Sequence, residues 1–107
     1  LWLRKTGHPV VFAVFLVGAA AALSMRADID RVVESYRNSL ACLQSERSAL
    51  IDAARAKYPD VAYDIDTYYR LLRFEFTDEL KSALAYYYAQ AGEMGLVPPV
   101  GEIRYYR

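Results

Sequence analysis

The chain has very few of the residues from which disulfide frameworks, metal centres and general-base sites are usually built. Its 107 residues include one cysteine, one histidine and one tryptophan, with five glycines and four prolines. A single cysteine excludes an internal disulfide framework and is compatible with a reducing compartment, so we expect a cytoplasmic protein. There is no glycine-rich phosphate loop, no Cys and His set at metal-ligand spacing and no nucleophile elbow, so the motifs for nucleotide, metal or acyl-transfer chemistry are missing.

Charge of one sign is also missing, because 13 basic residues balance 13 acidic ones. A neutral chain lacks the basic face that nucleic-acid binding usually requires, so we expect no nucleic-acid partner. Hydrophobic residues make up 55% of the sequence, which is typical of a globular domain. The cysteine, Cys42, lies among apolar residues of a predicted helix, and we expect it to be buried and inert.

The longest apolar run extends from Val10 to Met25 and follows a Gly7-His8-Pro9 turn. Its first part, residues 10–17, is rich in Val and Phe, which is typical of a buried strand in a mostly parallel sheet. Its second part is rich in Gly and Ala, which suits close packing. The run is shorter than the roughly 20 residues of a membrane-spanning helix, so we favour a core strand. A membrane anchor or signal segment within residues 10–25 remains the alternative.

Most of the remaining chain shows helical periodicity. Apolar residues at helical spacing and capping residues predict helices over residues 28–44, 46–58, 65–72 and 78–94. Asp28, Ser45, Asp64 or Asp66, and Thr77 are the predicted N-terminal caps, and Gly95 is the predicted residue after the last helix. The predicted buried positions are Ile29, Val32, Val33, Tyr36, Leu40, Leu43, Leu50, Ile51, Ala54, Tyr58, Ile65, Tyr68, Tyr69, Leu72, Leu80, Leu84, Tyr87, Ala91 and Met94. Residues 73–76 are predicted to be extended, and residues 102–106 could add a short edge strand.

Two features of the sequence invite a functional interpretation. His8, between a glycine and a proline, could donate to a ligand or act as a base, but a single ionisable group without a partner rarely makes a site, so we favour an exposed turn residue. The run Tyr86-Tyr87-Tyr88 cannot form one helical face, because successive residues point about 100° apart. We therefore expect packing rather than a stacking platform for bases.

Two blocks of the sequence resemble a known family. The first is Trp2-x3-Thr6-Gly7-x-Pro9-x-Val11-Phe12-Ala13-Val14, which is similar to the W-x3-T-G-L-P-F-V-F-A-V-W segment of the menaquinone-biosynthesis family of the futalosine route. The best-known member of that family is chorismate dehydratase. The second block comprises Tyr68-Tyr69, the segment 73–76, Leu80, Leu84, Tyr88, Ala91, Glu93, Gly95 and Leu96. The sequence departs from the first pattern at His8, Val10 and Phe15, where the family has Leu, Phe and Trp.

The resemblance implies an α/β fold with two lobes, of the type II periplasmic-binding-protein class, and a ligand cleft between the lobes. In that fold this chain, residues 1–107, would be the C-terminal portion, mostly helical with one core strand, and the family's N-terminal half would be absent. We therefore expect these residues alone to be inactive.

The activity implied by the resemblance is a carbon–oxygen lyase reaction, in which chorismate loses water to give 3-enolpyruvylbenzoate. The partner would be a small anionic molecule, and family members need no metal or nucleotide cofactor. By their position in the first block, Thr6, Gly7, Pro9 and Phe12 are the expected substrate-binding residues. Backbone donors of the Gly7-x-Pro9 turn would hold a carboxylate, and Phe12 or Phe15 would line the ring pocket. The catalytic base and the oligomeric state are not assigned.

Two other functions fit the sequence. One is a non-catalytic solute-binding protein of the same fold, which would carry an export signal. The other is a small helical protein anchored by a single membrane span in residues 10–25.

Overall fold

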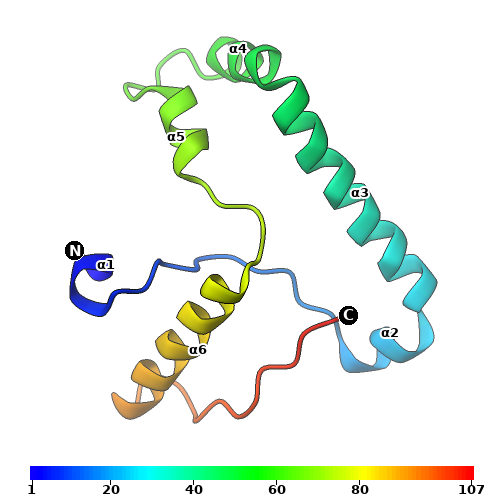
Figure 1. The fold of residues 1–107 in the computed structure, drawn as a ribbon, viewed down its shortest axis with the longest axis vertical. Coiled ribbons are helices and arrows are strands. Elements are labelled where there is room, and N and C mark those ends of the chain that lie inside the picture. The colour runs from blue at the N-terminus through cyan, green and yellow to red at the C-terminus, as the bar shows by residue number, and fades with distance from the viewer. The chain divides into compact units, whose positions relative to one another are not determined.

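The computed structural model describes residues 1–107 and contains six α-helices joined by irregular segments (Figure 1). They are α1 (Trp2–Thr6), α2 (Ala19–Ser24), α3 (Arg26–Ser45), α4 (Arg47–Lys57), α5 (Ile65–Leu71) and α6 (Asp78–Glu93). The chain forms two compact units. The terminal unit comprises Leu1–Ala19 and Glu75–Arg107, and the central unit comprises Ala20–Phe74.

The α/β architecture predicted from the sequence is wrong, because the structure contains no β-strand. Residues 10–17 run as an irregular segment, and so do the extended segments predicted at 73–76 and 102–106. A strand exists through backbone hydrogen bonds to a neighbouring strand, and Val- and Phe-rich composition favours one only where such a neighbour is present. Side chains of the predicted core strand are correspondingly exposed, Phe12 at 79% and Leu16 at 90%.

The four predicted helices occur with ends within two residues of the expected positions. The predicted 28–44 is α3, 46–58 is α4, 65–72 is α5 and 78–94 is α6. The short helices α1 and α2 were not expected. Two predicted caps are wrong: α3 begins after Met25, which places Asp28 in its first turn, and Glu46 rather than Ser45 precedes α4. None of the helices is both long enough and apolar enough to cross a membrane.

The central unit is held together around α4, which contacts both α3 and α5. Ile51 of α4 and Ile65 of α5 are its buried apolar side chains, and burial of each contributes about 1.5–3 kcal/mol. Arg47 at the start of α4 donates from Nε to Asp66 Oδ1 (3.0 Å) and from Nη2 to the Asp66 carbonyl (3.1 Å). Arg55, two turns later, donates to Asp64 Oδ1 (3.1 Å). Two arginines on one helix therefore fix the N-terminus of the next.

These contacts also set the acidity of the two aspartates. The pKa of Asp64, the N-cap of α5, lies below its ordinary 3.8 because Thr67 donates to the carboxylate from its hydroxyl and its backbone N–H, with Arg55 adding a further bond. The pKa of Asp66 is lowered first by its hydrogen bond from Arg70 and then by the one from Arg47. Both carboxylates favour the ionised form because cations and N–H donors surround them.

The apolar stripe predicted on α3 is not buried. No residue of α3 is fully buried, Val32 is 65% exposed, and Cys42 is exposed rather than packed in a core. Within its unit the only helix that α3 contacts is α4, so one short neighbour cannot cover a 20-residue helix. The periodicity correctly predicted the helix, but not the presence of a partner for its apolar face.

In the terminal unit, α6 has a side-chain cap at its start and a glycine stop at its end. Thr77 Oγ1 accepts from the Leu80 N–H (3.4 Å), as its predicted capping role requires. At the other end, Gly95 takes a left-handed conformation (φ 69°) and donates to the Gly92 carbonyl, while the Leu96 N–H donates to the Ala91 carbonyl. This pair of bonds is the Schellman motif and confirms the helix stop predicted at Gly95.

The buried face of α6 differs in part from the predicted one. Leu80, Leu84 and Ala91 are buried as expected, and Ala83 joins them. Tyr87 and Met94, which were predicted to be buried, are 50% and 72% exposed. The buried face therefore includes Ala83 and excludes Tyr87 and Met94.

Candidate functional site

The turn after α1 places the first resembling block in a tightly defined conformation. Gly7 ends the helix at φ 74° and ψ 1°, in the left-handed region that favours glycine, and its N–H donates to the Leu3 carbonyl (2.8 Å). A Cβ at this position would meet no atom within 4 Å. Glycine is therefore favoured at residue 7 by the backbone conformation alone.

The hydroxyl of Thr6 closes the same turn. Its Oγ1 donates to the Trp2 carbonyl (3.0 Å) and accepts from the His8 N–H (3.1 Å). The backbone donors of the turn are thus used internally: Gly7 and His8 both donate within the protein, and Pro9 has no N–H. In this conformation, the polar groups that the turn can offer a ligand are side chains, not backbone N–H groups.

His8 does not occupy the exposed position that was expected. Its side chain is half-buried, and its imidazole stacks on the ring of Tyr86 with 4.6 Å between centroids and 28° between planes. No hydrogen bond holds the imidazole nitrogens. The ring is therefore fixed by stacking, and its nitrogens are available to a ligand.

Trp2 adds a second aromatic contact between the turn and α6. Its indole lies 6.2 Å from Tyr86, at 64° between planes, and 6.0 Å from Tyr87, at 59°. Edge-to-face pairs of this kind contribute about 0.5–1.5 kcal/mol each beyond their buried area. We call Trp2, Thr6, His8, Tyr86 and Tyr87 the turn cluster. The cluster ties the first eight residues of the chain to α6.

The tyrosine run behaves as its helical geometry predicts. Tyr86 and Tyr87 face Trp2, whereas Tyr88 contacts Tyr87 edge to face, at 74° between planes, and lines a separate cavity described below. The three rings do not form a common stacking surface. Packing of Tyr86 and Tyr87 was expected, and the place of Tyr88 in the lining of a cavity was not.

The structure brings together some of the expected substrate-binding residues. Thr6, Gly7 and Pro9 lie in one turn, with Thr6 and Pro9 half-buried. Phe12 follows in the irregular segment with its ring 79% exposed, and Phe15 is 83% exposed. The turn therefore forms a defined polar and aromatic corner.

The stacking contact between His8 and Tyr86 was not predicted from the sequence. The two residues are far apart in the chain and lie in no common motif, so spacing gave no signal for their contact. The composition gave one hint: the sole tryptophan and the sole histidine fall within seven residues of each other. No group of three or more His, Cys, Asp or Glu side chains is placed to hold a metal ion.

Comparison with known proteins bears on this same part of the chain. A family model described as menaquinone biosynthesis matches residues 1–93, which include the whole turn cluster and all of α6. No curated protein matches the chain significantly, and neither does any solved structure. The family match covers most of the sequence and agrees with the resemblance of the first block. The chain belongs to the menaquinone-biosynthesis family.

Proposed function

We propose that this protein serves menaquinone biosynthesis as a chorismate dehydratase-like lyase, and that the turn at residues 6–9 binds a carboxylate of the substrate. The observation that carries the proposal is the family match over residues 1–93, which includes the Trp2-x3-Thr6-Gly7-x-Pro9 block. The half-buried corner at that block, with its unpaired imidazole, supports a binding role.

The proposed reaction is the loss of water from chorismate to give 3-enolpyruvylbenzoate. A base removes a ring proton, the C–H electron pair forms the new double bond of the aromatic ring, and the ring hydroxyl leaves with a proton as water. Such an elimination needs a positioned base and assistance to the departing hydroxyl. Substrate orientation is the contribution that the turn can make, because a held carboxylate fixes the ring relative to both groups.

Each turn residue contributes to orientation of the substrate through its own contacts. His8 offers an imidazole N–H to the carboxylate, and its ring is already oriented by Tyr86. Thr6 and Gly7 hold the turn that presents it, through the hydroxyl bonds of Thr6 and the left-handed backbone of Gly7. Pro9 restricts the chain that leaves the turn, and Phe12 follows as the apolar neighbour of the substrate ring.

The test uses the protein expressed from the complete open reading frame that encodes these residues. Purified protein is mixed with chorismate, and ultraviolet absorbance is followed for formation of the aromatic enolpyruvyl product. Turnover without added metal or nucleotide supports the proposal. Absence of turnover refutes the lyase assignment, and tight chorismate binding without turnover points instead to a solute-binding protein.

A pair of variants tests the role of the turn. His8→Leu installs the residue found in the resembling family pattern and removes the imidazole N–H. If His8 holds the carboxylate, KM for chorismate rises about tenfold or more, because a hydrogen bond to a charged group contributes about 1.5–3 kcal/mol. The matched control is Gln90→Leu, which changes a polar side chain of α6 outside the turn cluster and leaves KM unchanged. An unchanged KM in His8→Leu refutes the role given to His8.

A further inference from the structure

The C-terminal tail, residues 95–107, folds back along α6. Pro99 Cα lies 3.9 Å from the position that a Cβ on Gly92 would occupy, near the end of the helix. Tyr105 reaches the other end, where its ring lies 5.8 Å from that of Phe76. The tail therefore runs antiparallel to α6. It lies beyond the residues matched by the family model, which stop at 93.

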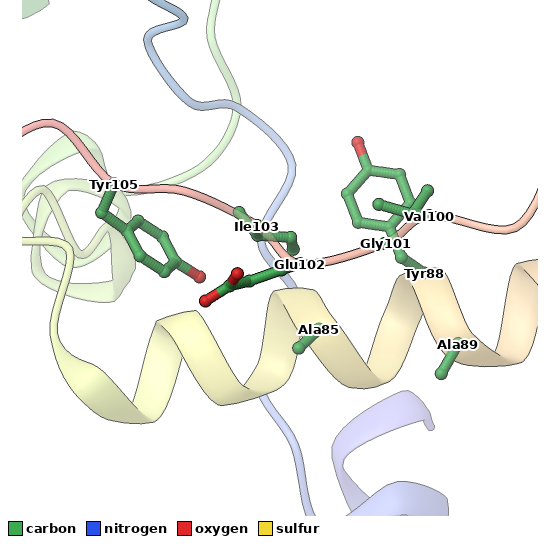
Figure 2. Close-up of a pocket in the computed structure, with 8 residues that line it drawn as sticks. All are labelled: Ala85, Tyr88, Ala89, Val100, Gly101, Glu102, Ile103 and Tyr105. Carbon is green, nitrogen blue, oxygen red and sulfur yellow. The ribbon is translucent and has the colours of Figure 1, made fainter.

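An open cavity of about 380 Å³ lies between the tail and α6 (Figure 2). Five of its eight lining residues are solvent-exposed, and Tyr88, Ile103 and Tyr105 are half-buried. The small side chains of Ala85 and Ala89 on the helix leave the space, and Val100 and Ile103 of the tail supply apolar walls. Small-molecule sites typically occupy about 300–1,000 Å³ and combine mainly apolar walls with a few polar groups. The cavity is therefore large enough for one small ring compound.

Two tyrosines give the cavity its aromatic sides. Tyr88 comes from α6 and Tyr105 from the tail, and Figure 2 shows the Tyr105 hydroxyl directed toward the Glu102 carboxylate. Outside the cavity, Tyr105 is held by the ring of Phe76 and by the ammonium of Lys81, 5.3 Å from its centroid. Because these contacts hold its ring without a ligand, this wall is already in place.

The charge of the cavity restricts what it can bind. Glu102 is the only acidic lining residue, and no basic residue lines the cavity. The neighbouring cation, Lys81, is already paired with Asp78 at 2.8 Å. An ionised carboxylate only accepts hydrogen bonds and repels anions, so a fitting ligand is not an anion and brings a donor.

We propose that this cavity is a binding site for hydroxylated aromatic compounds without a negative charge, of the phenol and naphthol class. The ring lies between Tyr88 and Tyr105, and its hydroxyl donates to Glu102. Aromatic carboxylates are disfavoured by the charge of Glu102. The site is separate from the proposed lyase reaction, because chorismate is a dicarboxylate, so the two proposals fail independently.

The test measures binding of two probes of the same ring size to the full chain by isothermal titration calorimetry. The probes are 1-naphthol, which is neutral, and 1-naphthoate, which is an anion. We expect 1-naphthol to bind at least tenfold more tightly. Equal affinities, or no binding of 1-naphthol, overturn the proposal.

Variants locate the site and test the charge argument separately. Ala89→Leu fills part of the cavity and lowers 1-naphthol affinity at least tenfold. Ala41→Leu makes the same change at a helix position that is exposed like Ala89 but lies outside the cavity, and it leaves the affinity unchanged. Glu102→Gln lies in the exposed tail and keeps the shape of the side chain. It brings the two affinities within about threefold of each other. Unchanged binding in Ala89→Leu, or an unchanged preference in Glu102→Gln, refutes the assignment.

Discussion

Replacement of Gly7 by alanine isolates the conformational strain of the turn. The Cβ would meet nothing within 4 Å, so the substitution introduces no clash and removes no contact. The cost comes only from placing an L-residue at φ 74°, which is about 1–2 kcal/mol. Alanine also reduces the entropy of the unfolded chain, which offsets about 0.4–1 kcal/mol. The expected net effect is destabilisation of the terminal unit by about 0.8 kcal/mol, within a range of roughly 0–1.6 kcal/mol from these two terms.

The fluorescence of the single tryptophan provides the assay for this prediction. Trp2 is the only tryptophan and contacts Tyr86 and Tyr87, so its fluorescence reports on whether α1 is docked on α6. Urea unfolding followed by tryptophan fluorescence should show a lower midpoint for Gly7→Ala than for the natural sequence.

The matched control is Gly18→Ala. A Cβ at Gly18 also meets nothing within 4 Å, but its φ is not positive, so the strain term disappears and only the entropic gain remains. Gly18→Ala should therefore be neutral or slightly stabilising, and the two variants should differ by about 1–2 kcal/mol. If both substitutions shift the midpoint equally, the left-handed turn at Gly7 does not stabilise the docked helix and the reasoning fails.

Three further predictions concern single interactions. Thr6→Val removes both hydroxyl bonds of the turn and should shift the tryptophan emission toward that of exposed indole; an unchanged spectrum would show that stacking alone holds α1. Tyr36→Phe loses the bond from the phenol to the Phe74 carbonyl (2.7 Å) and should destabilise the central unit by about 0.5–1.5 kcal/mol, measured as faster amide hydrogen exchange in α3; protection equal to the natural protein would contradict it. Asp64 and Asp66 have pKa values below 3.8 in the folded protein, so their stabilisation is present above about pH 4 and is lost as the pH falls through the lowered values. Helix content followed by circular dichroism should decrease there, less so in a double Asp→Asn variant, and a pH-independent signal down to pH 2 would exclude the linkage.

Features determined by neighbouring residues could be predicted from the sequence. Thr77 and Asp64 cap helices because a side chain reaches an N–H three residues away, and Gly95 ends one because only its own φ is required. These are local geometric requirements, so the pattern of residues is sufficient. The family membership was likewise evident from the spacing of Trp2, Thr6, Gly7 and Pro9.

Features that need a distant partner were predicted poorly. Residues 10–17 have the composition of a strand but no neighbouring strand, and Val32 has helical spacing but no helix to cover it. The stacking of His8 on Tyr86 was not predicted, because the two residues are distant in the chain and no short-range pattern in the sequence indicates their contact. Of the candidate site, the turn was therefore foreseeable and its aromatic partners were not.

The contact between His8 and Tyr86 joins positions 78 residues apart, and this has a consequence for biosynthesis. Ribosomes add about 5–20 residues per second, so α1 emerges roughly 4–16 s before the tyrosines on which it docks. The central unit is continuous in the chain, so all of its residues are synthesised during that interval. The loop that the contact closes is long, but the entropic cost of closing it grows only slowly with its length. The terminal unit therefore closes last, after translation has passed α6. Until then Trp2 and His8 lack their aromatic partners on α6, and both rings are exposed on the nascent chain.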